Sequence, residues 1–286
     1  GVHLDVSRHF FPIDSIKRFI DMMALHNINR LHWHLTDDQG WRIEIKKRPE
    51  LTTIGSKRSA TVIGHNSGEY DDVPYSGFYT QDEAKDIVRY AQERHIEVIP
   101  EIEMPAHSNA ALTAYPLLAC PVVNKYIGVL PGLGGENADI IFCAGNDSVF
   151  TFLQDVLDEV LELFPSKYIH LGGDEARKTH WENCPLCQAR MEQEKLANEE
   201  ELQGYFMGRM ARYVQSKGRE VIGWDELTNA TIPDDFIILG WQKYGEAAVK
   251  AAELGHRFIM TPARIMYLIR YQGPQWFEPL TYFGNN

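Results

Sequence analysis

Short apolar runs alternate along this chain with longer stretches in which apolar residues recur at three- and four-residue spacing. The runs are typical of strands, and the longer stretches are typical of amphipathic helices. One such stripe predicts a helix over residues 148–163, and another predicts an earlier helix from Ile13 to Met23. Strands are predicted at residues 2–6, 30–35, 97–103, 168–171, 220–224, 236–241 and 258–261.

Local signals place further elements between these strands. Thr80 followed by Glu83 forms a capping-box pattern, which predicts a helix from there to about residue 95. Another helix is predicted from about residue 201 to 216, and a hairpin is predicted around residues 41–45. Seven strand–helix units in series indicate a parallel sheet with right-handed crossover connections.

This series of units favours an α/β fold of the (β/α)8 TIM-type barrel, with an open doubly wound sheet as the alternative. No Gly-x-Gly-x-x-Gly motif or phosphate-binding loop follows a predicted strand, which disfavours a nucleotide-binding fold. No eighth strand is found before Asn286, so we expect residues 1–286 to form one barrel domain truncated before that strand. Because the chain begins directly with a strand, we expect it to be cut from a longer polypeptide, without its N-terminal accessory domain.

Composition and charge narrow the function classes. Hydrophobic residues make up 44% of the chain and aromatic residues 11%, which is enough for a sizeable core. The formal net charge of −12, with no Lys/Arg run, argues against nucleic acid or an anionic membrane as a partner. No apolar stretch reaches the length needed to span a membrane.

The four cysteines fall into two pairs in the sequence. Cys120 and Cys143 flank a segment with Gly and Pro, and this spacing predicts a loop-closing disulfide. A disulfide would fit an exported protein, in a periplasmic, secreted or lysosome-like compartment. Cys184 and Cys187 have CxxC spacing, but no second CxxC or His pair lies nearby in the sequence. We therefore expect a local disulfide or two free thiols there rather than a metal site.

Polar and aromatic residues collect where the predicted strands end. Alone, each has a simpler interpretation: His32 and His34 as core histidines, Asp38 as a turn cap, and Asp225 as the start of a helix. Together, acids, an arginine and flat aromatic rings at one rim indicate a sugar-binding pocket. A carboxylic acid there could protonate a glycosidic oxygen. The residues concerned are Arg8, His9, Asp37, Asp38, Glu103, His107, Asp174, Glu175, Trp224, Asp225, Glu226 and Trp241.

Four motifs give the chain a family resemblance over nearly its whole length. They are Leu4 to Phe10, His32 to Arg42, His170 to Glu175 (His-Leu-Gly-Gly-Asp-Glu), and Gly223 to Glu226. In these motifs the chain resembles the catalytic barrel of the β-N-acetylhexosaminidases, glycoside hydrolase family 20. The resemblance implies an exo-acting, retaining hydrolase that removes terminal β-linked N-acetylglucosamine or N-acetylgalactosamine from an oligosaccharide or glycoconjugate. It implies neither a cofactor nor a metal.

The resemblance also implies roles for individual residues. Glu175 matches the general acid/base, which carries a proton at the start of the cycle. Asp174 matches the residue that orients the substrate's 2-acetamido group, whose carbonyl oxygen acts as the nucleophile. The remaining matches concern substrate binding and support of the acid. Arg8 matches the ligand of the sugar hydroxyls, and Asp37 and His107 match a pair that tunes the acid. Trp224 and Trp241 match the walls of the acetamido pocket, and Tyr267 matches its hydrogen-bond donor.

The sequence departs from the family pattern at three places. Ile269 stands where a carboxylate for sugar hydroxyls is expected, and the family's Trp-x-Glu motif on strand eight would lie beyond Asn286. Glu103 and Ala106 replace the usual Asp and Gly near His107. The first two departures motivate an alternative, a barrel that binds an aminosugar without catalysis.

A second alternative is a metal-dependent hydrolase on the same barrel. His32 and His34 lie two positions apart on one predicted strand, and such a pair can hold zinc. Asp37 or His107 could complete the set of ligands, with His170 as a further candidate from a later strand.

Overall fold

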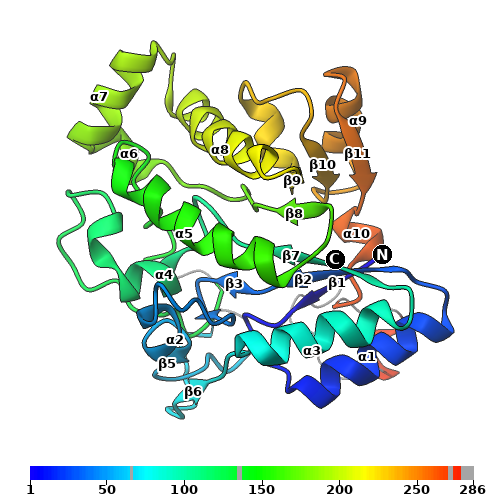
Figure 1. The fold of residues 1–286 in the computed structure, drawn as a ribbon. Coiled ribbons are helices and arrows are strands. Elements are labelled where there is room, and N and C mark those ends of the chain that lie inside the picture. The colour runs from blue at the N-terminus through cyan, green and yellow to red at the C-terminus, as the bar shows by residue number, and fades with distance from the viewer. Residues whose placement is uncertain (65–66, 134–136, 270–272, 278–286) are drawn as a thin grey trace.

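The computed structural model describes residues 1–64, 67–133, 137–269 and 273–277, and a seven-stranded parallel sheet forms its centre (Figure 1). Neighbouring strands follow one another in chain order, with parallel pairing at every described contact. The strands are β1 (Val2–Asp5), β2 (Arg30–His34), β7 (Glu97–Glu101), β8 (Tyr168–His170), β9 (Glu220–Trp224), β10 (Ile237–Gly240) and β11 (Arg257–Met260).

Two small antiparallel pairs accompany the central sheet. β3 (Thr36–Asp37) pairs with β4 (Gly40–Trp41), and β5 (Lys57–Arg58) pairs with β6 (Tyr75–Ser76). The hairpin predicted around residues 41–45 therefore lies earlier in the chain. Trp41 pairs back with Thr36, while Ile43 forms an isolated parallel bridge with Tyr79.

The main helices lie in sequence order around one side of the sheet (Figure 1). α1 contacts α3, α3 contacts α5, and α5 contacts α8, as expected for successive right-handed crossovers. No helix in the described part of the chain is long and apolar enough to cross a membrane. The helices are α1 (Ile13–Leu25), α2 (Glu50–Thr53), α3 (Gln81–Gln92), α4 (Asn109–Ala114), η1 (Pro116–Leu118), α5 (Asp147–Leu163), α6 (Thr179–Asn183), α7 (Pro185–Glu194), α8 (Glu199–Ser216), η2 (Asp225–Asn229), α9 (Glu246–Glu253), α10 (Ala263–Met266) and η3 (Gln275–Phe277).

Side-chain caps start the long helices. The capping box predicted at Thr80 is confirmed: its side chain accepts from the Glu83 backbone N–H, and the Glu83 carboxylate accepts from the Thr80 N–H. The Asn146 side chain caps α5 by accepting from the Ser148 N–H, and the Asn198 side chain caps α8 by accepting from the Glu201 N–H. The helix predicted from about residue 201 begins two residues earlier, because Asn198 is the cap.

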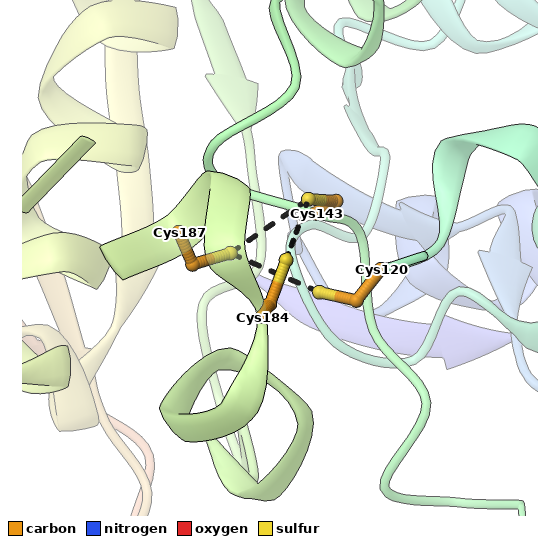
Figure 2. A group of neighbouring side chains, drawn as sticks. All are labelled: Cys120, Cys143, Cys184 and Cys187. Atoms are coloured by element: carbon orange, nitrogen blue, oxygen red, sulfur yellow. Dashed lines mark hydrogen bonds between the residues drawn. The ribbon is translucent and has the colours of Figure 1, made fainter. Parts of the chain in front are cut away.

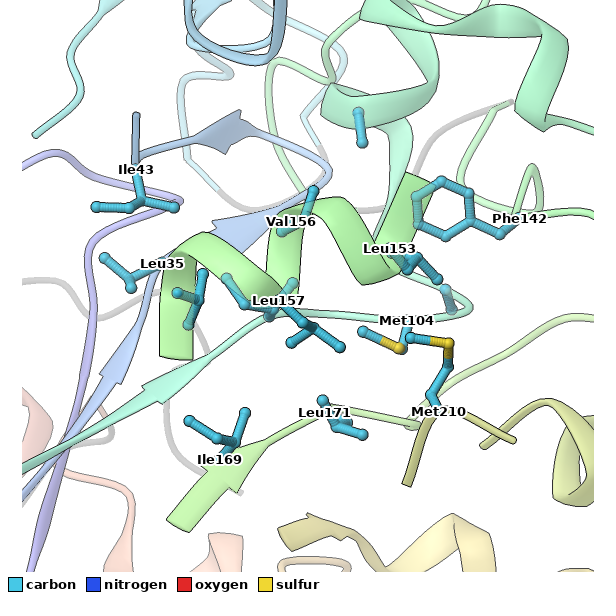
Figure 3. Packing of buried hydrophobic residues seen from close by; sticks show 14 of the residues in the cluster. Leu35, Ile43, Met104, Phe142, Leu153, Val156, Leu157, Ile169, Leu171 and Met210 are labelled. Atoms are coloured by element: carbon cyan, nitrogen blue, oxygen red, sulfur yellow. The ribbon is translucent and has the colours of Figure 1, made fainter. Parts of the chain in front are cut away.

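Apolar side chains pack on both faces of the sheet. On the outer face, Leu153 and Leu157 of α5 pack near Ile169 and Leu171 of the β8 segment, within one large buried cluster (Figure 3). A smaller cluster fills the inner face over the later strands: Ile99, Ile222, Trp224, Ile237 and Leu239. Alternate residues of a strand face opposite sides, so these strands are buried on both faces, as in barrels.

The sheet is an incomplete barrel. Within the described residues β1 pairs only with β2, and β11 pairs only with β10. All four residues of β11 are exposed, with Phe258, Ile259 and Met260 each between 44% and 46%. The predicted barrel that stops short of its eighth strand is confirmed. The doubly wound alternative is wrong, because the strand order has no reversal point.

The predicted disulfide between Cys120 and Cys143 is not formed. All four cysteines are free and buried. The loops bring all four thiols together, an arrangement that their spacing along the chain does not show. The exported location, which depended on that disulfide, stays a prediction.

The exposed β11 edge predicts self-association of residues 1–286 when they are produced alone. An unpaired strand with apolar side chains offers both backbone hydrogen bonds and apolar surface to another molecule. Phe258→Lys places a charge on this edge and should raise the concentration at which light scattering appears. Leu25→Lys, at an exposed position at the end of α1, is the matched control. An equal effect of both substitutions would contradict a role for the edge.

Candidate active site

The candidate site residues lie at the carboxyl ends of the strands, which meet at one rim of the sheet. Each residue of the predicted set is placed there by a strand or by the loop that follows it. Arg8 follows β1, Asp37 lies on β3 after β2, His107 follows β7, Asp174 and Glu175 follow β8, Trp224 ends β9, Trp241 follows β10, and Tyr267 follows β11.

One buried carboxylate, that of Glu101, lies at the centre of the inner face. His34 Nδ1 lies 2.6 Å and His32 Nε2 lies 2.8 Å from Glu101 Oε2. The indole N–H of Trp224 donates to Glu101 Oε1 at 2.8 Å. His170 lies 3.0 Å from the same oxygen. The end of β7 is therefore tied to β2, β8 and β9 by polar contacts.

The charges of this cluster are set by one another. Burial alone would raise the pKa of Glu101, but the histidines around it hold the pKa well below its usual range. Burial would lower the pKa of His34, yet Glu101 and Asp5 raise it to about 10. Burial lowers the pKa of His32 to about 3, against the pull of Glu101. At neutral pH, Glu101 is thus ionised, His34 is protonated and His32 is neutral.

These protonation states disfavour the metal-dependent hydrolase. A histidine ligates a metal through a neutral ring nitrogen. His34 has both ring nitrogens on carboxylates, with Nδ1 at Glu101 and Nε2 at 2.8 Å from Asp37 Oδ2. The pair that resembles a zinc motif therefore holds a carboxylate between its members, and both ring nitrogens of His34 are already in contact with carboxylates.

Arg8 joins the interior to the rim. Its Nη1 lies 3.1 Å from Asp5 Oδ2 and 2.6 Å from Asp37 Oδ2. Burial alone would lower the pKa of Arg8, but Asp37 and Asp5 raise it. Burial would raise the pKa of Asp37, but Arg8 and His107 hold it far below its usual range. Arg8 and Asp37 therefore both stay charged at neutral pH.

His107 lies between two pairs of acids. Its Nδ1 is 3.2 Å from both Asp37 Oδ1 and Asp38 Oδ2. Its Nε2 is 3.5 Å from Asp174 Oδ2 and 3.4 Å from Glu175 Oε2. Burial would lower the pKa of His107, but the charges of Asp37 and Asp174 raise it well above its usual value. Asp37 and His107, which the resemblance implies as a pair, lie in contact, and His107 also reaches the two acids. That the pair tunes the acid stays a prediction.

The glycines before Asp174 make the turn possible. Gly172 and Gly173 have φ values of 71° and 104°, where only glycine is unstrained. A Cβ on Gly172 would overlap the carboxylate of Glu103, and one on Gly173 would press on Leu227. The glycines are thus needed for close packing beneath the site as well as for the bend.

Asp174 and Glu175 differ in their surroundings. The Asp174 side chain is 17% exposed and that of Glu175 is 59% exposed. The buried Asp174 Oδ1 has no hydrogen-bond partner among the described residues. Glu175 and His107 both have positive φ values, 48° and 49°, which cost side-chain-bearing residues energy and are frequent at functional sites.

Aromatic groups form the side of the site next to β9 and β10. The rings of Trp241 and Tyr267 stack with centroids 6.3 Å apart. Trp241 Nε1 donates to Glu226 at 3.0 Å. Burial and the charge of Asp174 raise the pKa of Glu226 to about 9 and also raise that of Tyr267, so both side chains keep their protons at neutral pH.

Not every expected contact is present. Trp224 is 6% exposed and packs against His32 and His170, so it lies in the interior beneath the rim rather than as an open wall. Ile269 is 50% exposed and offers no polar group for a sugar hydroxyl. Glu103, one of the departures from the family pattern, is buried, and burial with the charges of Asp174 and Glu101 raises its pKa well above the usual value.

Sequence reasoning missed the central role of Glu101. It falls within the strand predicted at residues 97–103, and its two-residue spacing from Ile99 and Glu103 puts all three on one face, but the local pattern gives Glu101 no special place among them. His34 was interpreted as a core histidine, and it is buried, but it also connects Glu101 to Asp37. Asp38 reaches His107 and Asn109 rather than serving only the turn.

Glu101→Gln should lower the free energy of unfolding by about 3–5 kcal/mol, because Nδ1 of the buried, protonated His34 then loses its carboxylate partner. Glu97 begins the same strand and pairs with Arg30 at 2.8 Å near the surface. Glu97→Gln, the matched control, should cost about 0–1 kcal/mol. Urea denaturation of both variants measures the difference. Similar losses of unfolding free energy in the two variants would contradict the importance of Glu101 for stability.

Stability should depend on pH above neutrality. A group whose pKa is raised on folding stabilises the protein fully below its unfolded pKa and loses this effect as the pH rises through its folded pKa. For His34 the range is from about 6.5 to about 10, and His107 and Glu226 act in the same direction.

The free energy of unfolding should therefore fall over this range, by at most about 1.4 kcal/mol per pH unit for each proton. Urea titrations at several pH values measure the slope. His34→Gln should make the slope shallower, whereas His26→Gln, at an exposed helix end, should leave it unchanged. A flat profile in the unsubstituted protein would contradict the assigned charges.

Comparison with known proteins identifies the family. Residues 1–285 match the model of the glycosyl hydrolase family 20 catalytic domain. The chain is 46% identical to a β-hexosaminidase of Porphyromonas gingivalis, over 99% of this chain and 35% of that protein. It thus spans about a third of the length of that curated relative, and between 43% and 53% of the next two.

Solved structures agree with this assignment. A β-N-acetylhexosaminidase from Bacteroides fragilis matches 95% of this chain and 52% of its own, with a TM-score of 0.81 and 40% identity. An exo-β-N-acetylglucosaminidase from Vibrio harveyi, in complex with N-acetylglucosamine, matches 98% of this chain and 44% of its own, with a TM-score of 0.83 and 33% identity. The chain belongs to glycosyl hydrolase family 20 and matches its catalytic domain.

Proposed function

We propose that this chain is the catalytic domain of an exo-acting β-N-acetylhexosaminidase that removes terminal β-linked N-acetylglucosamine or N-acetylgalactosamine. Family membership supports the reaction class, and the named relatives support the substrate. The Vibrio harveyi protein in particular holds N-acetylglucosamine. The natural substrate is then an oligosaccharide or glycoconjugate that ends in such a sugar.

The observation that carries the proposal is the unequal pair Asp174 and Glu175. Asp174 is largely buried, and its Oδ1 is an acceptor without a partner in the described chain. A buried, unpaired carboxylate oxygen is costly unless a ligand donates to it. The N–H of a 2-acetamido group supplies such a donor. Glu175 is more exposed, where a leaving group can depart and water can enter.

The reaction then needs no nucleophile from the protein. The acetamido carbonyl oxygen attacks C1. The bond between C1 and the glycosidic oxygen breaks, and Glu175 gives its proton to the glycosidic oxygen, which departs with the leaving group. Asp174 stabilises the positive charge of the cyclic oxazolinium. Water then attacks C1, loses a proton to Glu175 and reopens the ring. Two inversions give net retention, the substrate-assisted exception to the two-carboxylate rule.

The surrounding residues have supporting roles in this proposal. Arg8 is charged and fixed by Asp5 and Asp37, so it presents a rigid donor to sugar hydroxyls. Protonated Tyr267 can donate to the acetamido oxygen, and its stacking on Trp241 makes a flat apolar wall. The ring of His107 contacts both Asp174 and Glu175, and the charge of Asp37 keeps that ring protonated.

Substitutions of the two acids should have different kinetic effects. Glu175→Gln removes the transferable proton and should lower kcat/KM about 10²–10⁴-fold on substrates with poor leaving groups, and less on activated aryl glycosides. Asp174→Asn should lower kcat/KM on both substrate kinds, because the acetamido group loses its orientation whatever the leaving group. Glu182→Gln, at an exposed position on α6, is the matched control and should change neither.

The choice of substrates tests the nucleophile. A glycoside without the 2-acetamido group should be almost inert, and a thiazoline analogue of the cyclised intermediate should inhibit strongly. Turnover of glycosides with and without the 2-acetamido group at equal rates would show that the protein supplies the nucleophile. Binding of N-acetylglucosamine without turnover in the full-length natural protein would instead favour the non-catalytic alternative.

A further inference from the structure

Away from the candidate active site, the four cysteines form one buried cluster (Figure 2). Each is 0–1% exposed. They come from two separate parts of the chain, because Cys120 and Cys143 lie in the connection after β7, while Cys184 and Cys187 lie in the connection after β8. The catalytic proposal uses none of them. Figure 2 shows the four sulfur atoms pointing toward a common centre.

The spacing of the sulfur atoms matches a tetrahedral metal site. Sγ of Cys143 lies 3.7 Å from those of Cys184 and Cys187, and Sγ of Cys120 lies 3.8 Å from that of Cys187. All four atoms lie within 4.8 Å of one another. Zinc–thiolate bonds of about 2.3 Å in a tetrahedron place neighbouring sulfurs about 3.8 Å apart.

We propose that these four cysteines bind one structural Zn²⁺ ion. Binding replaces four S–H bonds by four Zn–S bonds and releases four protons, with no change of oxidation state. Four protein ligands leave no open position, so the ion has a structural role rather than a catalytic one. Zinc is favoured over Mg²⁺ or Ca²⁺, which take oxygen ligands.

A pair of disulfides fits the geometry less well. The Sγ atom of Cys143 is equally distant from those of Cys184 and Cys187, so no exclusive partner is indicated. Cys184 and Cys187 are also separated by only two residues at the start of a helix, where CxxC pairs are typical zinc ligands. A single central ion satisfies all four sulfurs at once.

The backbone around the cluster is suited to thiolates. A side chain at Gly145 would overlap the backbone of Leu186 and Cys187, so glycine is needed for the two connections to approach. Cys184 is the N-cap residue of the ten-residue helix α7, whose N-terminal dipole also favours negative charge.

The ion would hold together the two connections that carry the candidate catalytic groups. His107 lies in the connection with Cys120 and Cys143, and the Asp174–Glu175 pair lies in the one with Cys184 and Cys187. Apart from the cysteines, Trp181 donates to the carbonyl of Phe142 at 2.9 Å across the same junction. Zinc therefore adds a further link between two long loops, which are already joined by this bond and by the contact of His180 with Asp139.

Elemental analysis of the full-length natural protein tests the proposal without any activity assay. After desalting into metal-free buffer, we expect about one zinc per chain by plasma mass spectrometry. Under denaturing, non-reducing conditions with chelator, all four cysteines of residues 1–286 should react with a thiol reagent, as read by mass spectrometry of the peptides that carry them. Chelation without denaturant should lower the thermal midpoint.

Substitutions locate the ion. Cys143→Ser and Cys184→Ser should each lose the bound zinc, whereas His32→Gln, at the other candidate cluster of ligands, should keep it. If the cysteine variants do not fold, the zinc content and thiol count of the unsubstituted protein still decide the question. Two or no reactive thiols would show disulfides and overturn the proposal. Four thiols with no metal, or iron in place of zinc, would also overturn it.

Discussion

The fold depends on a carboxylate buried where apolar side chains are the rule. Glu101 ends strand β7, the third of the seven in the sheet, and its two oxygens meet side chains from β2, β8 and β9. A buried ion must have its partners in place, because removal of one leaves a charge that nothing compensates. The relative register of four strands is thereby tied to one set of polar contacts. A shift in the register of any one of these strands would break them.

The same contacts determine the charges at the rim. Glu101 keeps His34 protonated, Arg8 and His107 together with His34 keep Asp37 ionised, and Asp37 in turn keeps His107 protonated beside Asp174 and Glu175. Each step is a short contact between groups of opposite charge. The field at the two acids is thus set before any ligand arrives. Such a field does not have to reorganise during a reaction, which is the usual advantage of a preorganised site.

Sequence reasoning found the strands and most rim residues because both follow local rules. Alternation and apolar runs located the strands, and polar residues just after them marked the rim. Glu101 and the cysteine cluster were missed for one physical reason. Their partners are distant in sequence, 67 residues for Glu101 and His34 and the same for Cys120 and Cys187, so only the packed fold brings them together. A CxxC without a second pair nearby in the sequence predicts no complete metal site, yet the other two cysteines of the cluster lie in an earlier connection.

The position of the candidate residues explains why such distant contacts are needed. His107 and Glu175 both have positive φ values, and each lies in a long connection rather than on a strand. Strained backbone persists only where its surroundings over-determine it. On the inner side, the series of charged contacts that runs from Glu101 to His107 supplies that constraint. On the outer side, the contact between the connections after β7 and β8 supplies it. Ordering a loop costs conformational entropy without the ladder of hydrogen bonds that a strand gains, so a fold that places its chemistry on loops needs strong contacts on both sides of them.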